Sequence, residues 1–515
     1  GTQQTMLARA AMPAVSGAEN ADYIRGVRTL ELNNGGTLRN RLTVLGDIVN
    51  SSPVYDPETS TVYVGANDGM LHAFDASALG AGKEHFAYVP GGIDIAALST
   101  LSDPAYSHRY FVDGPITLSR RDQTPNKTWL VGALGRGGTG IYTLDVTNPS
   151  APSATMAKWE ATQTPGNNMG KVLGQPVIAK LNSGHTAVIV PNGVDSPTGR
   201  AALLVYDLAT GALLSEIDTG IGSPVAENGL FSPTVRDTNG DGRIDYVYAG
   251  DLRGNLWKFN MTSASASDWS LPARRTLLFS AGASKPITSA PSIARDPATY
   301  KVWVFFGTGR FITNGDLTNM DVQSIYGMED GTSTIPSSDL QQRHVSVTGT
   351  VNGRIVRGFE IANSLPYGKK GWVIDLVQPP SPPGTAEGER IVSDVQVVAG
   401  ALIFSSIIPS KDPCQPGGSG YLNALDAFTG ASTTESLFDL DMDGDYQDEV
   451  IPGGGGSTPV GSVRLNGMGS LGTVLTGGGG GGQICLNISD ATIECNRIRE
   501  ARQVGRVSWR ELVRD

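Results

Sequence analysis

Residues 61–76 read Thr-Val-Tyr-Val-Gly-Ala-Asn-Asp-Gly-Met-Leu-His-Ala-Phe-Asp-Ala. Two runs rich in β-branched and aromatic residues flank the turn at 67–69, and this pattern predicts a β-hairpin. Similar pairs of strand-like runs follow at 129–145, 246–260 and 302–329. Two further segments, 202–211 and 420–430, resemble the second run of such a pair, and both end in Thr-Gly. A recurring hairpin unit indicates an architecture in which each repeat packs against its neighbours.

Most of these hairpins follow a short run with a small or polar residue before proline, as at Ser52-Pro53, Gly114-Pro115, Gln175-Pro176, Ser232-Pro233 and Ala290-Pro291. The repeating unit is a short inner strand followed by a meander, and it recurs roughly every 45 to 60 residues. This repeat predicts an all-β fold, namely a modified seven-bladed β-propeller. Five blades are clear and a sixth lies at about 395–430. We expect the seventh to be closed by residues 506–512 with N-terminal sequence. A pair of β-sandwiches is the alternative.

The composition is that of a chain rich in turns. Its 515 residues include 66 Gly and 30 Pro, and only 17% are charged. We therefore expect one β-propeller domain over residues 1–515, with inserted loops at 379–384, 453–456 and 477–482. The formal net charge of −11 argues against binding to nucleic acid and suits divalent cations. No apolar run is long enough to predict a membrane span.

A calcium-binding loop is predicted at residues 237–245, which read Asp-Thr-Asn-Gly-Asp-Gly-Arg-Ile-Asp. Calcium takes six to eight oxygen ligands, and alternating acidic and amide side chains supply them. The predicted ligands are Asp237, Asn239, Asp241, the backbone carbonyl of Arg243, and Asp245. Tyr248 stands where an EF-hand has its bidentate Glu, so this is a shortened loop between strands, similar to those of integrin-type propellers. A solvated turn without metal, or a purely structural ion, are the alternatives.

Residues 439–448 repeat the spacing less exactly. Asp439, Asp441, Asp443 and Gly444 take positions 1, 3, 5 and 6, but Gln447 takes position 9. A second metal site would use Asp439, Asp441, Asp443, Asp445 and Asp448. The alternative is a solvated acidic turn.

The three cysteines allow one local disulfide. Cys485 and Cys495 flank a short stretch in which a hairpin would bring the two sulfur atoms together, and two reduced buried thiols are the alternative. A disulfide would indicate an oxidising compartment. Cys414 is left over in a loop.

Recognisable catalytic motifs are absent from the sequence. It has no Gly-x-Ser-x-Gly elbow, no Walker loop and no Cys/His cluster, so we predict no catalytic residues and a protein that is not an enzyme. The five histidines are scattered, and each is expected to be a surface or turn residue.

Two families share segments with this chain. Residues 62–75 are similar to blades of pyrroloquinoline-quinone dehydrogenases, but the adjacent Cys-Cys pair of those enzymes is missing. A broader resemblance is to the C-terminal propeller of PilY-type proteins, the type IV pilus biogenesis factors and tip-associated adhesins of Gram-negative bacteria. Its segments occur in order along nearly the whole chain, at 23–26, 45–54, 231–251, 304–311, 412–418 and 506–510.

This second resemblance implies a quinoprotein-dehydrogenase-like propeller that uses Ca²⁺ at 237–245 as a switch between pilus extension and retraction. It also implies twitching motility, virulence and adhesion to surfaces or host cells. Expected partners are type IV pilin or minor pilins and a host-cell surface receptor. The expected location is the periplasm, the outer-membrane surface and the pilus fimbrium. The chain starts without Met, so we expect an excised C-terminal portion that lacks the family's N-terminal region. A quinone-dependent dehydrogenase or a purely structural repeat protein are the alternative functions.

Overall fold

The structure is a computed structural model that describes residues 2–379, 381–410, 417–453, 456–475 and 482–499. Cys414 and the predicted closing segment 506–512 lie outside these residues. The chain forms two compact units, Gly1–Asp251 with Lys258–Arg275, and Leu252–Trp257 with Thr276–Asp515.

Helices are short and few. The α-helices of the described residues are α1 (Thr2–Met6), α2 (Gly17–Ile24) and α3 (Ile95–Leu98). The 3-10 turns are Leu32–Asn34, Ser99–Ser102, Gly135–Gly137, Ala154–Met156, Ala266–Asp268, Pro272–Arg274, Asn314–Leu317 and Ser337–Asp339. Helix α2 begins at a capping box, in which Ser16 Oγ accepts from the Glu19 amide and Glu19 Oε2 accepts from the Ser16 amide. No helix in the described part of the chain is long and apolar enough to cross a membrane.

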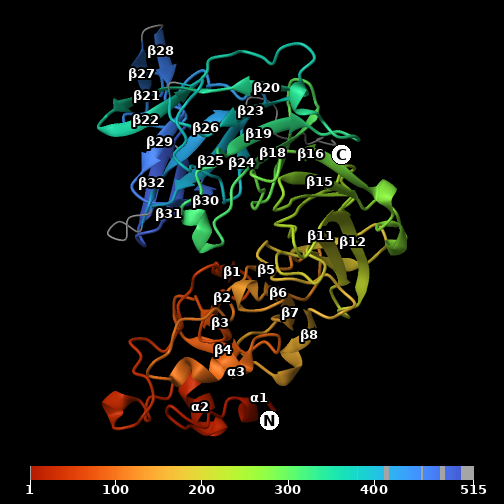
Figure 1. Ribbon diagram of the computed structural model, residues 1–515, viewed down its shortest axis with the longest axis vertical. Coiled ribbons are helices and arrows are strands. Elements are labelled where there is room, and N and C mark those ends of the chain that lie inside the picture. Colours follow the sequence, from red (N-terminus) through yellow and green to blue (C-terminus); the bar gives the residue numbers. More distant parts are fainter. Residues whose placement is uncertain (1, 380, 411–416, 454–455, 476–481, 500–515) are drawn as a thin grey trace, which may run out of the picture. The chain divides into compact units, whose positions relative to one another are not determined.

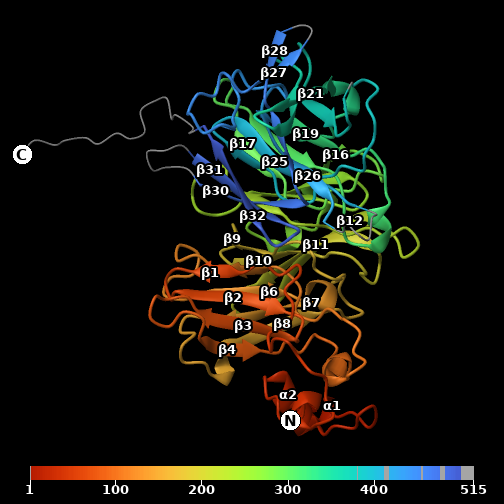
Figure 2. The ribbon, with the colours of Figure 1, turned by 90° about the vertical axis from the view of Figure 1, so that its left-hand side faces the viewer.

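Four-stranded antiparallel meanders fill most of the first unit (Figures 1 and 2). The first sheet contains β1 (Val54–Asp56), β2 (Thr61–Ala66), β3 (Met70–Asp75) and β4 (Glu84–Tyr88). The second contains β5 (Ile116–Leu118), β6 (Trp129–Ala133), β7 (Gly140–Asp145) and β8 (Ala157–Thr162). The third contains β9 (Val177–Lys180), β10 (Thr186–Pro191), β11 (Arg200–Asp207) and β12 (Leu213–Gly222). The predicted hairpin is β2–β3, with Thr61 opposite Asp75 and Ala66 opposite Met70.

The fourth sheet has the order β13 (Thr234–Arg236), β14 (Tyr246–Gly250), β15 (Asn255–Asn260) and β16 (Arg275–Ser280). The fifth begins with β17 (Ser292–Arg295), β18 (Val302–Gly307) and β19 (Ser324–Glu329), and then continues with β23 (Gly371–Asp375) and the parallel strand β20 (Leu340–Arg343). Residues 330–370 thus form an insertion between the third and fourth strands of the fifth sheet.

Part of that insertion joins the sixth sheet, whose order is β21 (Val345–Val351), β22 (Arg354–Phe359), β29 (Ser462–Leu465), β26 (Ser419–Asp426), β25 (Ala401–Ile408) and β24 (Gln396–Val398). A separate pair of antiparallel strands is formed by β27 (Val450–Gly453) and β28 (Gly456–Pro459), so the first and last residues of the predicted inserted loop at 453–456 pair with each other. Residues 454–455 lie outside the described residues. Figure 1 shows this strand pair beside β21 and β22.

The seventh sheet contains β30 (Gly469–Leu475), β31 (Gly482–Ile488) and β32 (Ile493–Ile498). The described residues therefore form seven sheets besides the β27–β28 pair, which confirms the predicted seven-bladed β-propeller class. Cys485 and Cys495 face each other on β31 and β32, and a disulfide joins them with a sulfur–sulfur distance of 2.04 Å.

The two Thr-Gly turns noticed in the sequence dock against tryptophans. The indole nitrogen of Trp159 on β8 donates to the Leu208 carbonyl at 2.8 Å, and that of Trp372 on β23 donates to the Ala427 carbonyl at 2.8 Å. Gly211 and Gly430 have φ of +73° and +66°, and a Cβ at either would meet the indole at 2.6 or 2.3 Å. Only glycine suits both the left-handed backbone and the close approach of the ring. The repeated sequence thus specifies a repeated contact between neighbouring sheets.

Candidate functional site

The first acidic loop, residues 237–245, connects β13 to β14 in the fourth sheet. Its end is fixed by the Asp245 amide, which donates to the Arg236 carbonyl at 2.8 Å, and by a backbone bridge between Ile244 and Leu181. Arg243 Nη1 donates to the Leu181 carbonyl at 2.9 Å. The Arg243 side chain is therefore engaged outside the loop, and its backbone carbonyl is the atom it can offer to a cation.

Side-chain oxygens of this loop turn inward onto its own backbone. Asp237 accepts from the amides of Gly240 at 2.7 Å, Gly242 at 2.8 Å and Asn239 at 3.1 Å. Asn239 Oδ1 accepts from the Asp241 amide at 2.9 Å, and Asp241 Oδ1 accepts from the Arg243 amide at 2.8 Å. Burial opposes ionisation of Asp237, but the amides outweigh it and hold its pKa below the ordinary value. A carboxylate oxygen that accepts one amide keeps another lone pair for a metal.

Asp245 is placed differently, because its side chain is buried. Its Oδ2 accepts from the Thr238 amide at 2.9 Å and from the Thr238 hydroxyl, and its Oδ1 accepts from Asn182 Nδ2 at 3.3 Å. Asp245 thus ties the end of the loop to its beginning. Among the described residues, some groups of three acidic side chains have oxygens that all lie within 4.8 Å of one another. Asp237, Asp241 and Asp245 do not form such a group. The structure therefore joins Asp237, Asn239 and Asp241 through local hydrogen bonds, and engages the Asp245 carboxylate with Thr238 and Asn182.

The second acidic loop precedes β27 and does contain such groups. One comprises Asp439, Asp441 and Glu449, and the other comprises Asp441, Asp443 and Asp448. In each group, one carboxylate oxygen per residue lies within 4.8 Å of the others. A cluster of acidic residues that could hold a metal ion is therefore present, and its oxygen donors fit a hard cation such as calcium.

Glu449 was not among the predicted ligands, whereas Asp445 was predicted and belongs to neither group. Asp445 Oδ1 instead accepts from the Gln447 amide at 2.9 Å. Glu449 is fully buried, while Asp448 is exposed. Burial raises the pKa of Glu449, and the charges of Asp441 and Asp448 add to this effect against hydrogen bonds from the Leu440 and Asp441 amides. The available signal was the position of Glu449 directly before the apolar start of a strand.

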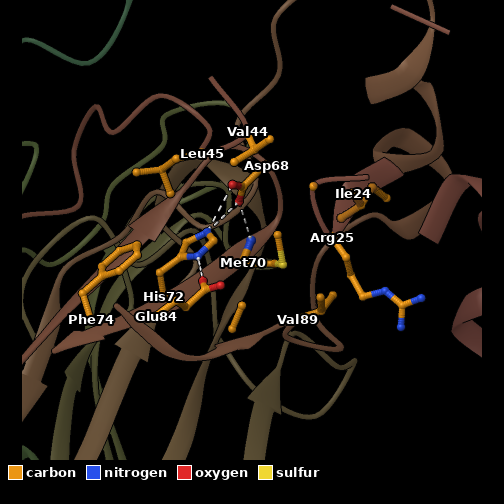
Figure 3. A pocket seen from close by; sticks show the side chains of 12 residues that line it. Ile24, Arg25, Val44, Leu45, Asp68, Met70, His72, Phe74, Glu84 and Val89 are labelled. Carbon is orange, nitrogen blue, oxygen red and sulfur yellow. Dashed lines mark hydrogen bonds and ion pairs between the residues drawn. The ribbon is translucent and has the colours of Figure 1, made fainter. Parts of the chain in front are cut away.

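A pocket of about 440 Å³ lies in the first unit beside the β2–β3 hairpin (Figure 3). His72 on β3 lies between two carboxylates there, with Nδ1 2.6 Å from Glu84 Oε1 and Nε2 3.1 Å from both oxygens of Asp68. The prediction that every histidine is a surface or turn residue is wrong for His72, which is only 4% exposed and stacks on Phe74. Burial lowers its pKa, but Asp68 and Glu84 outweigh burial, and the pKa is raised.

Known proteins resemble this chain over nearly its whole length. Residues 46–345 match the family described as the PilY1 beta-propeller domain. A type IV pilus biogenesis factor PilY1 homolog from Xylella fastidiosa is 34% identical over 97% of the chain and 41% of its own length. Type IV pilus biogenesis factor PilY1 from Pseudomonas aeruginosa strain PAK is 30% identical over 96% of the chain and 47% of its own length. The chain thus spans less than half of these relatives.

Among solved structures, the crystal structure of the Pseudomonas aeruginosa PilY1 C-terminal domain matches with a TM-score of 0.66 and 29% sequence identity. The match covers 85% of this chain and 92% of that domain. The resemblance in sequence therefore extends to the fold.

Proposed function

The chain belongs to the PilY1 beta-propeller family, whose relatives named above are type IV pilus biogenesis factors, and we propose that it is a calcium-binding module that regulates pilus extension against retraction. The regulation would support twitching motility, adhesion to surfaces or host cells, and virulence. The module is not an enzyme in this proposal, since its acidic groups are arranged as cation donors.

The loop at 237–245 is the observation that carries the proposal. It lies within the residues that match the family, and its donors are oxygens from side chains and backbone. Asn239 and Asp241 are exposed, so an ion bound there would exchange with the solvent. An exchangeable ion can report the calcium concentration, whereas an enclosed ion would only add stability.

The family supports a location in the cell envelope or the pilus. We propose that the protein acts in the periplasm, on the outer-membrane surface and in the pilus fimbrium of a Gram-negative bacterium. Type IV pilin or minor pilins are the proposed partners, with a host-cell surface receptor as a further one. The disulfide between Cys485 and Cys495 supports an oxidising compartment outside the cytoplasm.

The test is surface piliation in a bacterium that carries the full-length protein with Asp241→Ala. This substitution removes a predicted ligand, and since Asp241 is exposed and bonds only within the loop, we expect the fold to survive. Asp122→Ala is the matched control, because Asp122 is also exposed and pairs only with the neighbouring Arg120 in the described contacts. We expect Asp241→Ala to change the number of surface pili and Asp122→Ala to leave it unchanged. Equal piliation in all three strains would reduce any ion at this loop to a structural part.

A further inference from the structure

The second acidic loop holds two buried carboxylates that each lack a partner on one oxygen. Asp439 Oδ1 and Glu449 Oε2 are buried and have no hydrogen-bond partner among the described residues. Their sister oxygens are bonded, since Asp439 Oδ2 accepts from the Gly444 amide and Glu449 Oε1 accepts from the Leu440 amide at 2.6 Å. A buried carboxylate oxygen without a partner is unfavourable unless a cation or donor faces it.

Oxygens from the two buried residues and from exposed Asp441 lie within 4.8 Å of one another. Calcium binds oxygens at about 2.3–2.6 Å, so two ligands on opposite sides of the ion are separated by up to about 5 Å. The spacing therefore fits three ligands of one calcium ion.

The local charge balance also favours a divalent cation. Arg497 Nη1 lies 3.1 Å from Asp439 Oδ2, and this guanidinium contributes a single positive charge against three carboxylates. Asp443 and Asp448 add further negative charge on the exposed side. A divalent ion between Asp439, Asp441 and Glu449 would balance the net charge that these three carboxylates and Arg497 leave.

The loop is fixed to the last described strand of the seventh sheet. The Asp439 amide donates to the Arg497 carbonyl at 3.2 Å, and Arg497 Nη1 also donates to the Met442 carbonyl at 3.0 Å. A backbone bridge joins Phe438 to Ile498. The group that holds Asp439 thus comes from β32, the strand whose Cys495 is joined to β31 by the disulfide.

We propose that Asp439, Asp441 and Glu449 bind a second calcium ion, and that this ion latches the loop onto β32. Glu449 replaces the position-9 ligand that the spacing lacks, and Asp439 joins the ion to Arg497. Calcium at this site therefore holds the edge of the seventh sheet in place. The site is separate from the loop at 237–245, so either can fail without the other.

The test is calcium calorimetry on the purified chain carrying Asp241→Ala, in which the first loop is disabled. We expect one calcium ion to bind, and Glu449→Gln to weaken its affinity at least about tenfold, since it removes a charged ligand and keeps the side-chain shape. Asp445→Asn makes the same change of charge in the same loop outside the ligand set, and we expect its affinity to stay within about threefold. Equal weakening by both substitutions, or weakening by Asp448→Asn alone, would overturn the ligand assignment.

Hydrogen exchange provides a second measurement that needs no substitution at the proposed ligands. In the Asp241→Ala protein, we expect calcium to slow exchange of the amides at 437–449 and along β32, and to leave those of the first sheet unchanged. If calcium does not slow amide exchange along β32, the proposed contact between the ion-bound loop and β32 is wrong, whatever the stability of the Glu449 variant. If Asp241→Ala abolishes calcium-dependent piliation while the second site still binds calcium, the two sites act independently.

Discussion

The buried ion pair between Arg357 and Glu389 offers a demanding test of the sixth sheet. Arg357 lies on β22 and is 2% exposed, and its Nη1 is 2.7 Å from Oε2 of Glu389, whose side chain is 1% exposed. The guanidinium also lies 3.5 Å from the centre of the Tyr421 ring on β26. Arg357 thus joins the inserted strand β22 to the strands of the original blade.

Arg357→Met should destabilise the second unit by about 3–5 kcal/mol, because it leaves the Glu389 carboxylate buried without a positive charge. Loss of the contact with Tyr421 adds to this cost. For a unit of this size, the melting temperature should fall by roughly 6–20 °C. Glu389 keeps one hydrogen bond, since Ser406 Oγ donates to its Oε1 at 2.6 Å. The loss of unfolding free energy should therefore not exceed about 5 kcal/mol.

The assay is a double-mutant cycle with Arg357→Met and Glu389→Gln, followed by calorimetric or denaturant unfolding. The double variant removes both charges and should recover at least about 2 kcal/mol relative to the sum of the single effects. Arg120→Met is the control, because its pair with Asp122 is exposed to solvent and should contribute little to stability. A loss below about 1 kcal/mol for Arg357→Met, or purely additive single effects, would refute the buried pair.

Two further predictions concern a titrating group and a cross-link. The pKa of His72 is raised in the folded protein above the ordinary value of 6.5. The stability that the charged His72 adds to the fold is therefore fully present below pH 6.5 and is lost as the pH rises through the raised pKa. The gap in unfolding free energy between the natural chain and His72→Gln should therefore be wider at about pH 6 than at about pH 9, and a constant gap would contradict the pairing with Asp68 and Glu84. The disulfide closes a loop with a sequence separation of 10, so replacing Cys485 and Cys495 together by Ser should cost about 2–3 kcal/mol in denaturant unfolding. An unchanged unfolding midpoint of the double variant, measured without reductant, would contradict the cross-link.

Local pairings could be predicted from the sequence, and distant ones could not. The hairpin at 61–75 pairs neighbours across a three-residue turn, so its alternating runs and turn residues already specify the register. In the fifth sheet, β19 pairs with β23 across the insertion at 330–370, and β22 leaves for the sixth sheet to pair with β29. Nothing in the local pattern of these runs names their partners. The sequence predicts that residues 506–512 with N-terminal sequence close the seventh blade. Residues 506–512 lie outside the described residues, and the described strands of the seventh sheet come from residues 469–498.

The acidic loops divide in the same way. Asp237, Asn239 and Asp241 bond to amides two to five residues ahead, which is a local geometry that spacing alone can predict. Glu449 was missed because adjacent residues turn to opposite sides, and burial of Glu449 against exposed Asp448 depends on the surrounding sheets. His72 was missed for a related reason, since Glu84 reaches it from a neighbouring strand.

The central claim is that calcium binds at residues 237–245, and a crystal structure of the chain grown with calcium tests it most directly. We predict an ion about 2.3–2.6 Å from oxygens of Asp237, Asn239 and Asp241 and from the Arg243 carbonyl. Asp245 already bonds to Thr238, so it should reach the ion through a water molecule. A structure at saturating calcium in which this loop keeps only its own hydrogen bonds and holds no ion would contradict the account.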